Sequence, residues 1–376
     1  MSSRLFKIAA VCLLILAAHA PAFAYSGDFD ALVFDFDVES DFSEKWAAPA
    51  LTDYTIRAIS LNSKERAMPR DALKRLASRW AAAGRREMAF ETRDALRQHT
   101  GASFIVDGSL SRDRSGFQFT GSVINPDTGL VRDISFTLKE FDIEAARGAL
   151  RGTLETALGR KLPNDKSALL GTASSAASAA HWKGMWHYER NEAEKAIAFF
   201  QQSMSADPAF IEPALSLARA QMDKALFSDA AAILRKAISS APKEPRAHFL
   251  LGLALHLQRQ KQLSLESLST ASNLDPRNPE YLFQLGVVHK ESFRYPEAIS
   301  YFEKSLAIDK SYDAWFTLAE IYATTKQEQK AIHSLEQAAV WSRAGLLNRL
   351  KNDADFNWLR SNARFQLLIK QLERQP

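Results

Sequence analysis

Small and large apolar residues in the second half of the chain recur at intervals of about 34 residues. Small residues form one column at Gly184, Ala218, Gly252, Gly286 and Ala319, and a second at Ala196, Ala230, Ser264, Ala298 and Ala331. A third column holds Phe200, Leu234, Leu268, Phe302 and Leu335, and a fourth holds Pro208, Pro242, Pro276 and then Lys310. Small residues let two helices cross closely, large ones suit contact with the next unit, and proline ends a helix. The columns therefore predict five helical hairpins over residues 177–343.

The first half of the chain has a different pattern. Residues 31–38, ALVFDFDV, alternate with a period of two, which predicts a half-buried strand. Helical patterns are expected at 47–60, 71–83 and 89–99, and again at 143–158. Between them, ASFIVDGSL, FQFTGSVI and LVRDISFTLK read as three strands separated by turn-forming residues. We therefore expect an α/β sandwich domain over residues 25–160, followed by a partly flexible Ser/Ala-rich linker at 161–176.

The repeated columns resemble the tetratricopeptide repeat, a helix-turn-helix unit of about 34 residues. The resemblance covers five units and implies an all-α solenoid with a concave groove lined by each first helix. Ala180 and Lys183 replace large apolar residues in the first unit, which suggests a degenerate, capping unit. Residues 344–376 resemble the helices that close such arrays, and we expect Phe356, Trp358, Leu359 and Phe365 to cover the last exposed face.

The same resemblance implies which side chains line the groove. They are His181, Met185, Tyr188, Leu215, Arg219, Met222, Phe249, Leu253, His256, Phe283, Val287, Lys290, Phe316 and Glu320. Three phenylalanines flanked by charged residues would suit an amphipathic helix or an extended peptide with apolar anchors. In the alternative interpretation, the position that holds Phe249, Phe283 and Phe316 leans into the hairpin and the rings belong to the core.

The N-terminal domain resembles the amino-terminal domain of the translocation protein TolB. Related domains occur in curli-secretion lipoproteins and in lipoprotein activators of penicillin-binding proteins. The matching stretches are LVFDFDVES and TGASFIVDGSLSRDRSGFQFTGSVINPDTG. The resemblance implies contact with envelope proteins, so a regulatory or assembly subunit that acts through this domain is an alternative function.

The N-terminus has the layout of a secretory signal peptide. Arg4 and Lys7 precede an apolar run that is too short for a membrane span, and Ala22-Phe23-Ala24 supplies a cleavage site. Removal of residues 1–24 takes away Cys12, the single cysteine, and lowers the net charge from +4 to +2. We therefore expect a periplasmic or secreted protein without disulfides, and we expect neither nucleic-acid binding nor a further membrane span.

The sequence Asp35-Phe36-Asp37 raises an enzymatic alternative. A strand that ends in Asp-x-Asp resembles the nucleophile and acid of phosphatases of the haloacid dehalogenase class. That chemistry also needs a lysine and a second acidic cluster for Mg²⁺. Glu39 stands where threonine is usual, and no Asp-Asp or Gly-Asp-x-x-x-Asp cluster precedes the repeats. We therefore expect a non-catalytic interaction scaffold without cofactor or metal, in which Asp35 and Asp37 face solvent.

Overall fold

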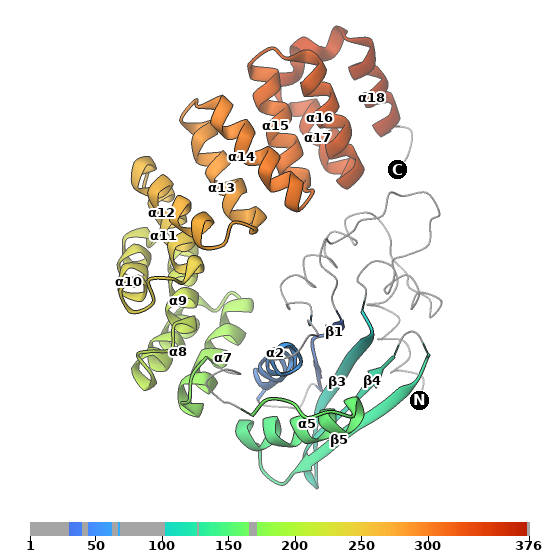
Figure 1. Cartoon of the computed structure of the whole chain (residues 1–376), viewed down its shortest axis with the longest axis vertical. Helices are drawn as coiled ribbons and strands as arrows, with labels where there is room; N and C mark the ends of the chain where they lie inside the picture. Colours follow the sequence, from blue (N-terminus) through green and yellow to red (C-terminus); the bar gives the residue numbers. More distant parts are fainter. Residues whose placement is uncertain are drawn as a thin grey trace. The chain divides into compact units, whose positions relative to one another are not determined.

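The computed structural model describes residues 30–39, 44–61, 67, 102–125, 128–164 and 171–373 of the 376-residue chain. The chain divides into two compact units, Met1–Lys224 and Ala225–Pro376. Figure 1 shows a sheet and its helices in the first unit, and successive helical hairpins in the second. Each unit is described by itself below. The predicted signal peptide and the predicted helices at 71–83 and 89–99 lie outside the described residues.

The described sheet of the first unit is a meander with parallel strands at one side. Strands β3 (Phe104–Asp113), β4 (Gly116–Ile124) and β5 (Val131–Leu138) pair antiparallel in sequence order. Strands β1 (Ala31–Val33) and β2 (Asp37–Val38) both pair parallel to β3. The three strands expected from the alternating pattern at 102–139 are thereby confirmed.

One face of the meander is apolar and carries two helices. On β4, Phe117, Phe119 and Val123 are buried, whereas the intervening Gln118 and Thr120 are partly exposed. Helices α2 (Ala47–Ser60) and α5 (Ile143–Leu158) contact each other as well as the strands, so they form one layer against the sheet. Both helices begin and end where the sequence pattern predicts them.

A paired glycine position explains how the two central strands accommodate this aromatic core. Gly108 and Gly121 are cross-strand partners in β3 and β4. A Cβ at Gly108 would lie 2.4 Å from the Phe119 ring, and a Cβ at Gly121 would lie 2.3 Å from the Asp107 carbonyl oxygen. Glycine is therefore required at both positions for close approach, and Phe119 fills the space above Gly108.

The prediction of one continuous strand at 31–38 is wrong. The segment breaks at residues 34–36 into β1 and β2. Ala31, Leu32 and Val33 are all fully buried, so the period-two alternation fails there. Strand β1 pairs with β3 along one edge and with Ala67 along the other, and α2 packs against it. A strand that is buried on both faces reads as a continuous apolar run.

The repeated columns form the expected helical hairpins. The first unit holds α7 (Ser175–Glu189), α8 (Ala193–Ala206) and α9 (Glu212–Asp223). The second unit holds α10 (Phe227–Ser240), α11 (Pro245–Leu257), α12 (Lys261–Leu274), α13 (Pro279–Glu291), α14 (Tyr295–Ile308), α15 (Tyr312–Thr324) and α16 (Glu328–Trp341). Each recurring proline follows the end of a second helix by two residues, as its role as a helix stop predicts.

The small and large columns meet inside each hairpin. A Cβ at Gly184 would lie 2.5 Å from the Phe200 ring, and one at Gly286 would lie 2.8 Å from the Phe302 ring. The close crossing predicted for the small column is thus confirmed. The large column differs from expectation, because these rings pack on the first helix of their own hairpin, where the missing Cβ leaves room.

The turn inside each hairpin contains one residue in the left-handed conformation. These residues are Asn191, Ala225, Arg259, Phe293 and Lys326, with φ between 59° and 65°. Asparagine tolerates this region, but the other four side chains carry a strain of about 1 kcal/mol relative to glycine. The strain follows from the repeated turn geometry, which fixes the backbone whatever residue occupies the position.

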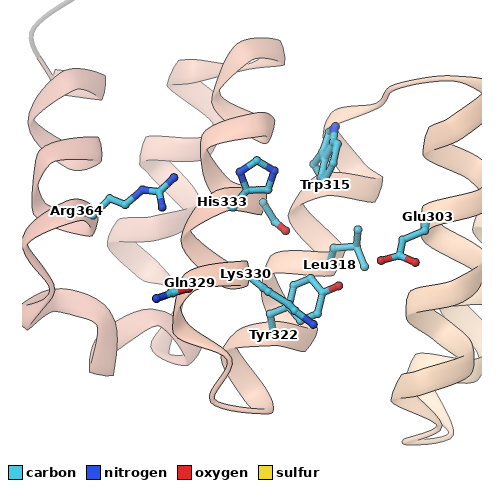
Figure 2. Close-up of a pocket in the computed structure, with 9 residues that line it drawn as sticks. Glu303, Trp315, Leu318, Tyr322, Gln329, Lys330, His333 and Arg364 are labelled. Carbon is cyan, nitrogen blue, oxygen red and sulfur yellow. The ribbon is translucent and has the colours of Figure 1, made fainter.

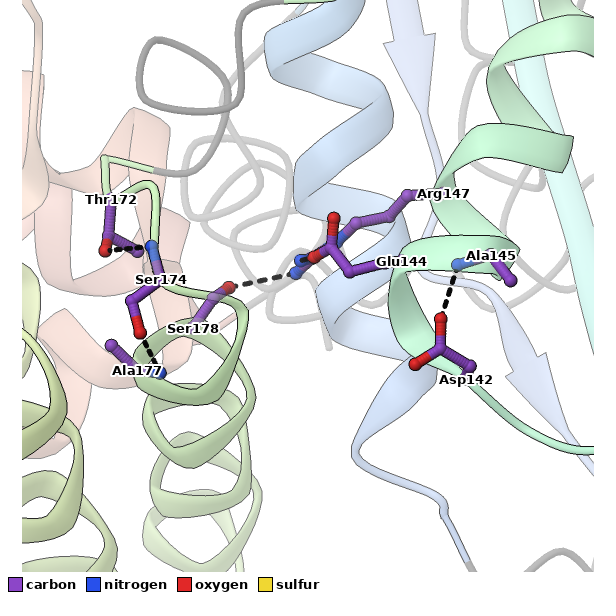
Figure 3. Close-up of polar contacts among 8 residues, drawn as sticks. All are labelled: Asp142, Glu144, Ala145, Arg147, Thr172, Ser174, Ala177 and Ser178. Atoms are coloured by element: carbon purple, nitrogen blue, oxygen red, sulfur yellow. Dashed lines mark hydrogen bonds and ion pairs between the residues drawn. The ribbon is translucent and has the colours of Figure 1, made fainter.

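The N-terminal domain packs directly on the first hairpin (Figure 3). The buried Arg147 of α5 donates to Glu144 at 2.8 Å and to the Ser178 hydroxyl of α7 at 3.0 Å. The Lys183 ammonium lies 5.4 Å from the centre of the Trp46 ring. Lys183 therefore stands where a repeat would carry a large apolar residue because this face of α7 meets the N-terminal domain.

Several described residues of the predicted linker are anchored. The Leu162 amide donates to Glu155 at 3.0 Å, and the Thr172 hydroxyl donates to Asp207. Ser174 caps α7, which begins at Ser175 within the predicted linker. Leu162, Thr172 and Ser174 are thus held by neighbouring elements, while the partial flexibility expected for the linker stays a prediction (Figure 3 shows Thr172 and Ser174).

The C-terminal segment closes the second unit. It forms α17 (Arg343–Asn352), the short 3-10 helix η2 (Ala354–Ser361) and α18 (Ala363–Glu373). Phe356, Leu359 and Phe365 are buried in the same core as Phe316 and Leu335, and Trp358 packs against it. The predicted covering of the last apolar face by this segment is confirmed.

Candidate partner-binding face

The first helices of the second unit are joined to one another by side chains that the sequence singled out. His256 Nε2 of α11 lies 3.4 Å from Glu291 Oε1 of α13, and Lys290 of α13 forms an ion pair with Glu320 of α15. The rings of Phe249 in α11 and Tyr281 in α13 are 4.7 Å apart. We call the surface of α11, α13 and α15 that carries Leu253, His256, Phe283, Val287, Lys290 and Glu320 the first-helix face.

In the compact unit Met1–Lys224, the first helices of two successive hairpins, α7 and α9, are also in contact. The Tyr188 hydroxyl of α7 donates to the Asp223 carboxylate of α9. Burial, followed by this hydrogen bond, raises the pKa of Tyr188 to about 12. The Met185 sulfur lies 3.5 Å from the Ser216 hydroxyl, while Arg219 is exposed and Met222 half-buried. Met185 and Tyr188 of α7 thus each contact a residue of α9, the helix that carries Arg219 and Met222.

Four of the predicted groove residues do not reach an open surface. His181, Leu215, Phe249 and Phe316 are buried in the hydrophobic core. The expectation that they line a groove is wrong, because this position of the first helix leans into the hairpin and against the next helix. The interpretation that places these rings in the core holds for Phe249 and Phe316.

The buried His181 shows the electrostatic consequence of this position. Its ring is surrounded by Trp182, Phe200 and Phe210, with centroid distances between 5.4 and 5.8 Å. Burial lowers the pKa of His181 to about 4, because the apolar surroundings disfavour the imidazolium. His181 is therefore neutral at physiological pH and acts as a packing residue.

Three apolar side chains remain half-exposed on the first-helix face. Leu253, Phe283 and Val287 lie on α11 and α13 and are neither fully buried nor fully exposed. The Phe283 ring packs on Phe302 at 5.4 Å, so one side of it belongs to the core. Apolar side chains that pack on the core on one side and are accessible on the other can contact the apolar anchor residues of a partner peptide or helix.

Sequence reasoning missed the residues that pair with these candidates. Glu291 and Asp223 occupy the same position of their hairpins, one residue after Lys290 and Met222, and each accepts a contact from the preceding first helix. Arg349 of α17 was also missed, although its guanidinium carbon lies 4.3 Å from the centre of the Phe316 ring. The sequence offered one signal for Asp223 and Glu291: each acidic residue directly follows the last predicted groove residue of its helix.

A hollow lies among the last helices of the second compact unit (Figure 2). It has a volume of about 500 Å³ and is lined by residues of α14, α15, α16 and α18. Its charged groups are engaged locally, since Arg364 pairs with Glu336 and the Lys330 ammonium lies 5.3 Å from the centre of the Tyr322 ring. The hollow was not anticipated from the sequence.

The aspartates of the enzymatic alternative are both exposed. Asp35 lies between β1 and β2, and Asp37 begins β2. Within the described ranges, no group of three or more His, Cys, Asp or Glu side chains is arranged to hold a metal ion. Among the same residues, no helix combines the length and apolar character that crossing a membrane requires.

Comparison with known proteins identifies the helical hairpins. Models of the tetratricopeptide repeat match residues 187–254, 279–312 and 312–343. The probable UDP-N-acetylglucosamine–peptide N-acetylglucosaminyltransferase SPINDLY of Arabidopsis thaliana is 35% identical over 86 residues, 23% of this chain and 9% of the relative. The chain therefore spans less than a tenth of that relative's length.

Solved structures are similar to part of the chain. A structure of PilF from Pseudomonas aeruginosa is 20% identical and covers 53% of this chain and 91% of its own, with a TM-score of 0.45. A structure of MamA is 24% identical and covers 41% of this chain and 91% of its own, with a TM-score of 0.39. The family matches show tetratricopeptide repeats in residues 187–254 and 279–343 of this chain.

Proposed function

We propose that the protein is a non-catalytic interaction protein of the bacterial periplasm. On this proposal, the first-helix face binds a peptide or helix of another envelope protein. The observation that carries the proposal is the set of half-exposed apolar side chains, Leu253, Phe283 and Val287, on a face where Lys290 pairs with Glu320. Tetratricopeptide repeats mediate protein–protein interactions, which agrees with this reading of the face.

The paired charges determine what kind of partner suits the face. Lys290 is bound by Glu320, so this pair offers little net charge to a ligand. A partner gains chiefly by burying apolar side chains against Leu253, Phe283 and Val287, at about 25 cal/mol per Å² of apolar surface. The proposed ligand is therefore a segment with apolar anchors at helical or extended spacing.

The cellular location in this proposal is supported by the sequence alone. The basic N-terminus, short apolar run and small residues at 22–24 have the order of an export signal. The resemblance of the N-terminal domain to the TolB amino-terminal domain is consistent with an envelope protein. Mass spectrometry of the protein from a periplasmic extract tests this, and an intact residue 1–24 segment in a cytoplasmic fraction would refute it.

A second candidate is an assembly or regulatory subunit that acts through the N-terminal domain. The contact between Arg147 and Ser178 favours it, because it holds this domain in a fixed position on the first hairpin. A partner bound by the sheet domain would then be oriented relative to the first hairpin. Partner capture that persists when the first-helix face is altered would support this candidate.

Site-directed photo-crosslinking tests the main proposal. A benzophenone side chain placed at Leu253 or Val287 should crosslink one defined protein in intact cells. Val340 of α16 is the matched control, because it is an exposed apolar residue away from this face. The double variant Leu253→Gln/Val287→Gln should lose the same partner without losing helical content. A crosslinking pattern that is identical at positions 253, 287 and 340 would refute the proposal.

A further inference from the structure

Strand β5 is the outermost strand of the sheet in the compact unit Met1–Lys224 (Figure 1). It contains no proline, and in the described part of the chain it pairs with β4 alone. The Asn125 amide donates to the Leu130 carbonyl oxygen at 2.9 Å, which sets the alternation of hydrogen bonds between β4 and β5. The backbone groups of every second residue of β5 therefore point to the open edge, and these residues are Val131, Asp133, Ser135 and Thr137.

The charged residues of this edge lie at its two ends. Arg132 and Asp133 stand near the start of β5, and Lys139 and Glu140 directly follow its end. In an antiparallel pair of two such segments, RDISFTLKE, each positive residue therefore faces a negative one. Arg132 already donates to the Ala157 carbonyl oxygen. Asp133 and Lys139 are exposed, and neither forms an ion pair with a described residue.

One register satisfies both the backbone and the charges. With a two-fold axis at Phe136, Asp133 faces Lys139 of a second copy, and Ser135 faces Thr137. This register also places opposite each other the residues whose backbone groups point to the open edge, so strand hydrogen bonds can form. Moving the axis by one residue in either direction separates Asp133 from Lys139. The edge is therefore complementary to itself in a single register.

Cross-strand pairing of hydroxyl side chains already occurs within this sheet. The Ser109 hydroxyl of β3 lies 3.2 Å from the hydroxyl of Thr120, its partner on β4. Thr120 is in turn the cross-strand partner of Ser135 on β5. A pair of Ser135 and Thr137 between two copies would therefore continue the same row of hydroxyls across a shared sheet.

Helix α5 leaves room for a second copy beside β5. Because α5 contacts β5, joining two β5 strands brings two α5 helices alongside each other. The four exposed residues of α5 are all small, and they are Ala145, Gly148, Gly152 and Thr156. No atom lies within 4 Å of a Cβ placed at Gly148 or Gly152. The distance between packed helices depends on the side chains at their contact, so the exposed side of α5 tolerates a close neighbour.

We propose that the protein forms a two-fold symmetric dimer in which two β5 strands join the sheets of two copies. The strands pair antiparallel about Phe136, and Asp133 and Lys139 form one ion pair on each side of the axis. This closed contact covers the exposed edge of β5 in both copies. It does not involve the first-helix face, so the dimer carries two such faces.

Sedimentation velocity of the chain without residues 1–24 tests the proposal. Measured over a range of concentrations, it should show an equilibrium between monomer and dimer. Ser135→Pro removes an N–H that points to the open edge and leaves the hydrogen bonds to β4 in place. This variant should be monomeric, with the circular dichroism of the wild type. A wild-type chain that stays monomeric at its highest soluble concentration would overturn the proposal.

Charge reversal decides the question even where the proline variant does not fold. Asp133→Lys sets like charges opposite each other twice in the dimer and should raise its dissociation constant about tenfold. Asp133→Lys/Lys139→Asp restores opposite charges and should return the constant to near the wild-type value. Asp229→Lys, at an exposed position of α10, is the matched control and should leave the constant unchanged. A dimer that Asp133→Lys does not weaken, or that the double variant does not rescue, would overturn the proposal.

Disulfide formation reports the register directly. The chain without residues 1–24 contains no cysteine, so an introduced thiol reports one contact. A mixture of Ser135→Cys and Thr137→Cys chains should form a mixed disulfide faster than either variant crosslinks with itself, because the register makes these positions direct partners. Equal rates in the mixture and in the two separate variants would refute the proposed pairing.

Discussion

Replacement of Phe316 by alanine distinguishes a core position from a binding position. Phe316 belongs to the set of side chains that the family resemblance places in the groove, yet it is 1% exposed. Its ring packs on Phe356 and Tyr312, each at a centroid distance of 5.8 Å, and Arg349 lies over it. We therefore expect Phe316→Ala to destabilise the C-terminal hairpin and its closing segment.

The size of the effect follows from these contacts. Truncation of a buried phenylalanine to alanine costs about 3–5 kcal/mol, because transfer free energy is lost and a cavity remains. The aromatic pairs with Phe356 and Tyr312 place the expected value in the upper part of this range. Leu253→Ala is the matched comparison, and it should cost less than half as much because Leu253 is only half-buried.

Hydrogen exchange measured by mass spectrometry is the appropriate assay. Repeat arrays can unfold hairpin by hairpin, so one global midpoint would mix several transitions. Amides of α15 and α16 should exchange at least a hundredfold faster in Phe316→Ala, whereas those of α11 and α12 should change little. If the amides of α15 and α16 stay equally protected from exchange while partner binding is lost, Phe316 is a groove residue and its assignment to the core is refuted.

Two further predictions concern glycine and histidine positions. Gly286→Ala should destabilise the chain by about 1–3 kcal/mol in urea unfolding, because its Cβ would lie 2.8 Å from the Phe302 ring. Gly148→Ala is the matched control: no atom lies near its Cβ on α5, so alanine should stabilise the chain by about 0.5–1 kcal/mol. The opposite order would contradict the crossing geometry. His181 has a pKa of about 4, lowered from the ordinary 6.5, so the unfolded chain binds the extra proton between these values. Stability should therefore be unaffected above pH 6.5 and fall by about 3 kcal/mol as the pH drops to 4, and His181→Phe should remove that loss in pH-dependent unfolding.

The repeat columns determined the helical part of the fold because each column has a single physical role. Gly286 has to be small where Phe302 crosses it, and Pro276 has to follow the end of α12. Such local requirements are visible in sequence because they recur every 34 residues or so. The first strand lacked this advantage. Its apolar residues alternate with a period of two, but the burial of Ala31, Leu32 and Val33 depends on elements that come later in the sequence, such as α2 and β3.

The candidate site was predictable only in part for a related reason. Leu253 and Val287, which the family resemblance places in the groove, are half-exposed on the first helices, so their role in binding stays a prediction. The position of Phe249 and Phe316 could not be decided from sequence, because a phenylalanine serves equally as a core residue or as an anchor. Tyr281 and Phe356 settle it, and both come from neighbouring elements. The ion pair between Lys290 and Glu320 could not be predicted from the sequence either, because its two residues come from different helices.

Salt dependence tests how a partner is held on the first-helix face. Lys290 forms an ion pair with Glu320, and the proposed anchors Leu253, Phe283 and Val287 are apolar, so added salt should weaken partner binding little. The dissociation constant of the partner, measured between low and high salt, checks this expectation. An affinity that falls steeply with added salt would mean that charged groups, rather than the apolar side chains, hold the partner.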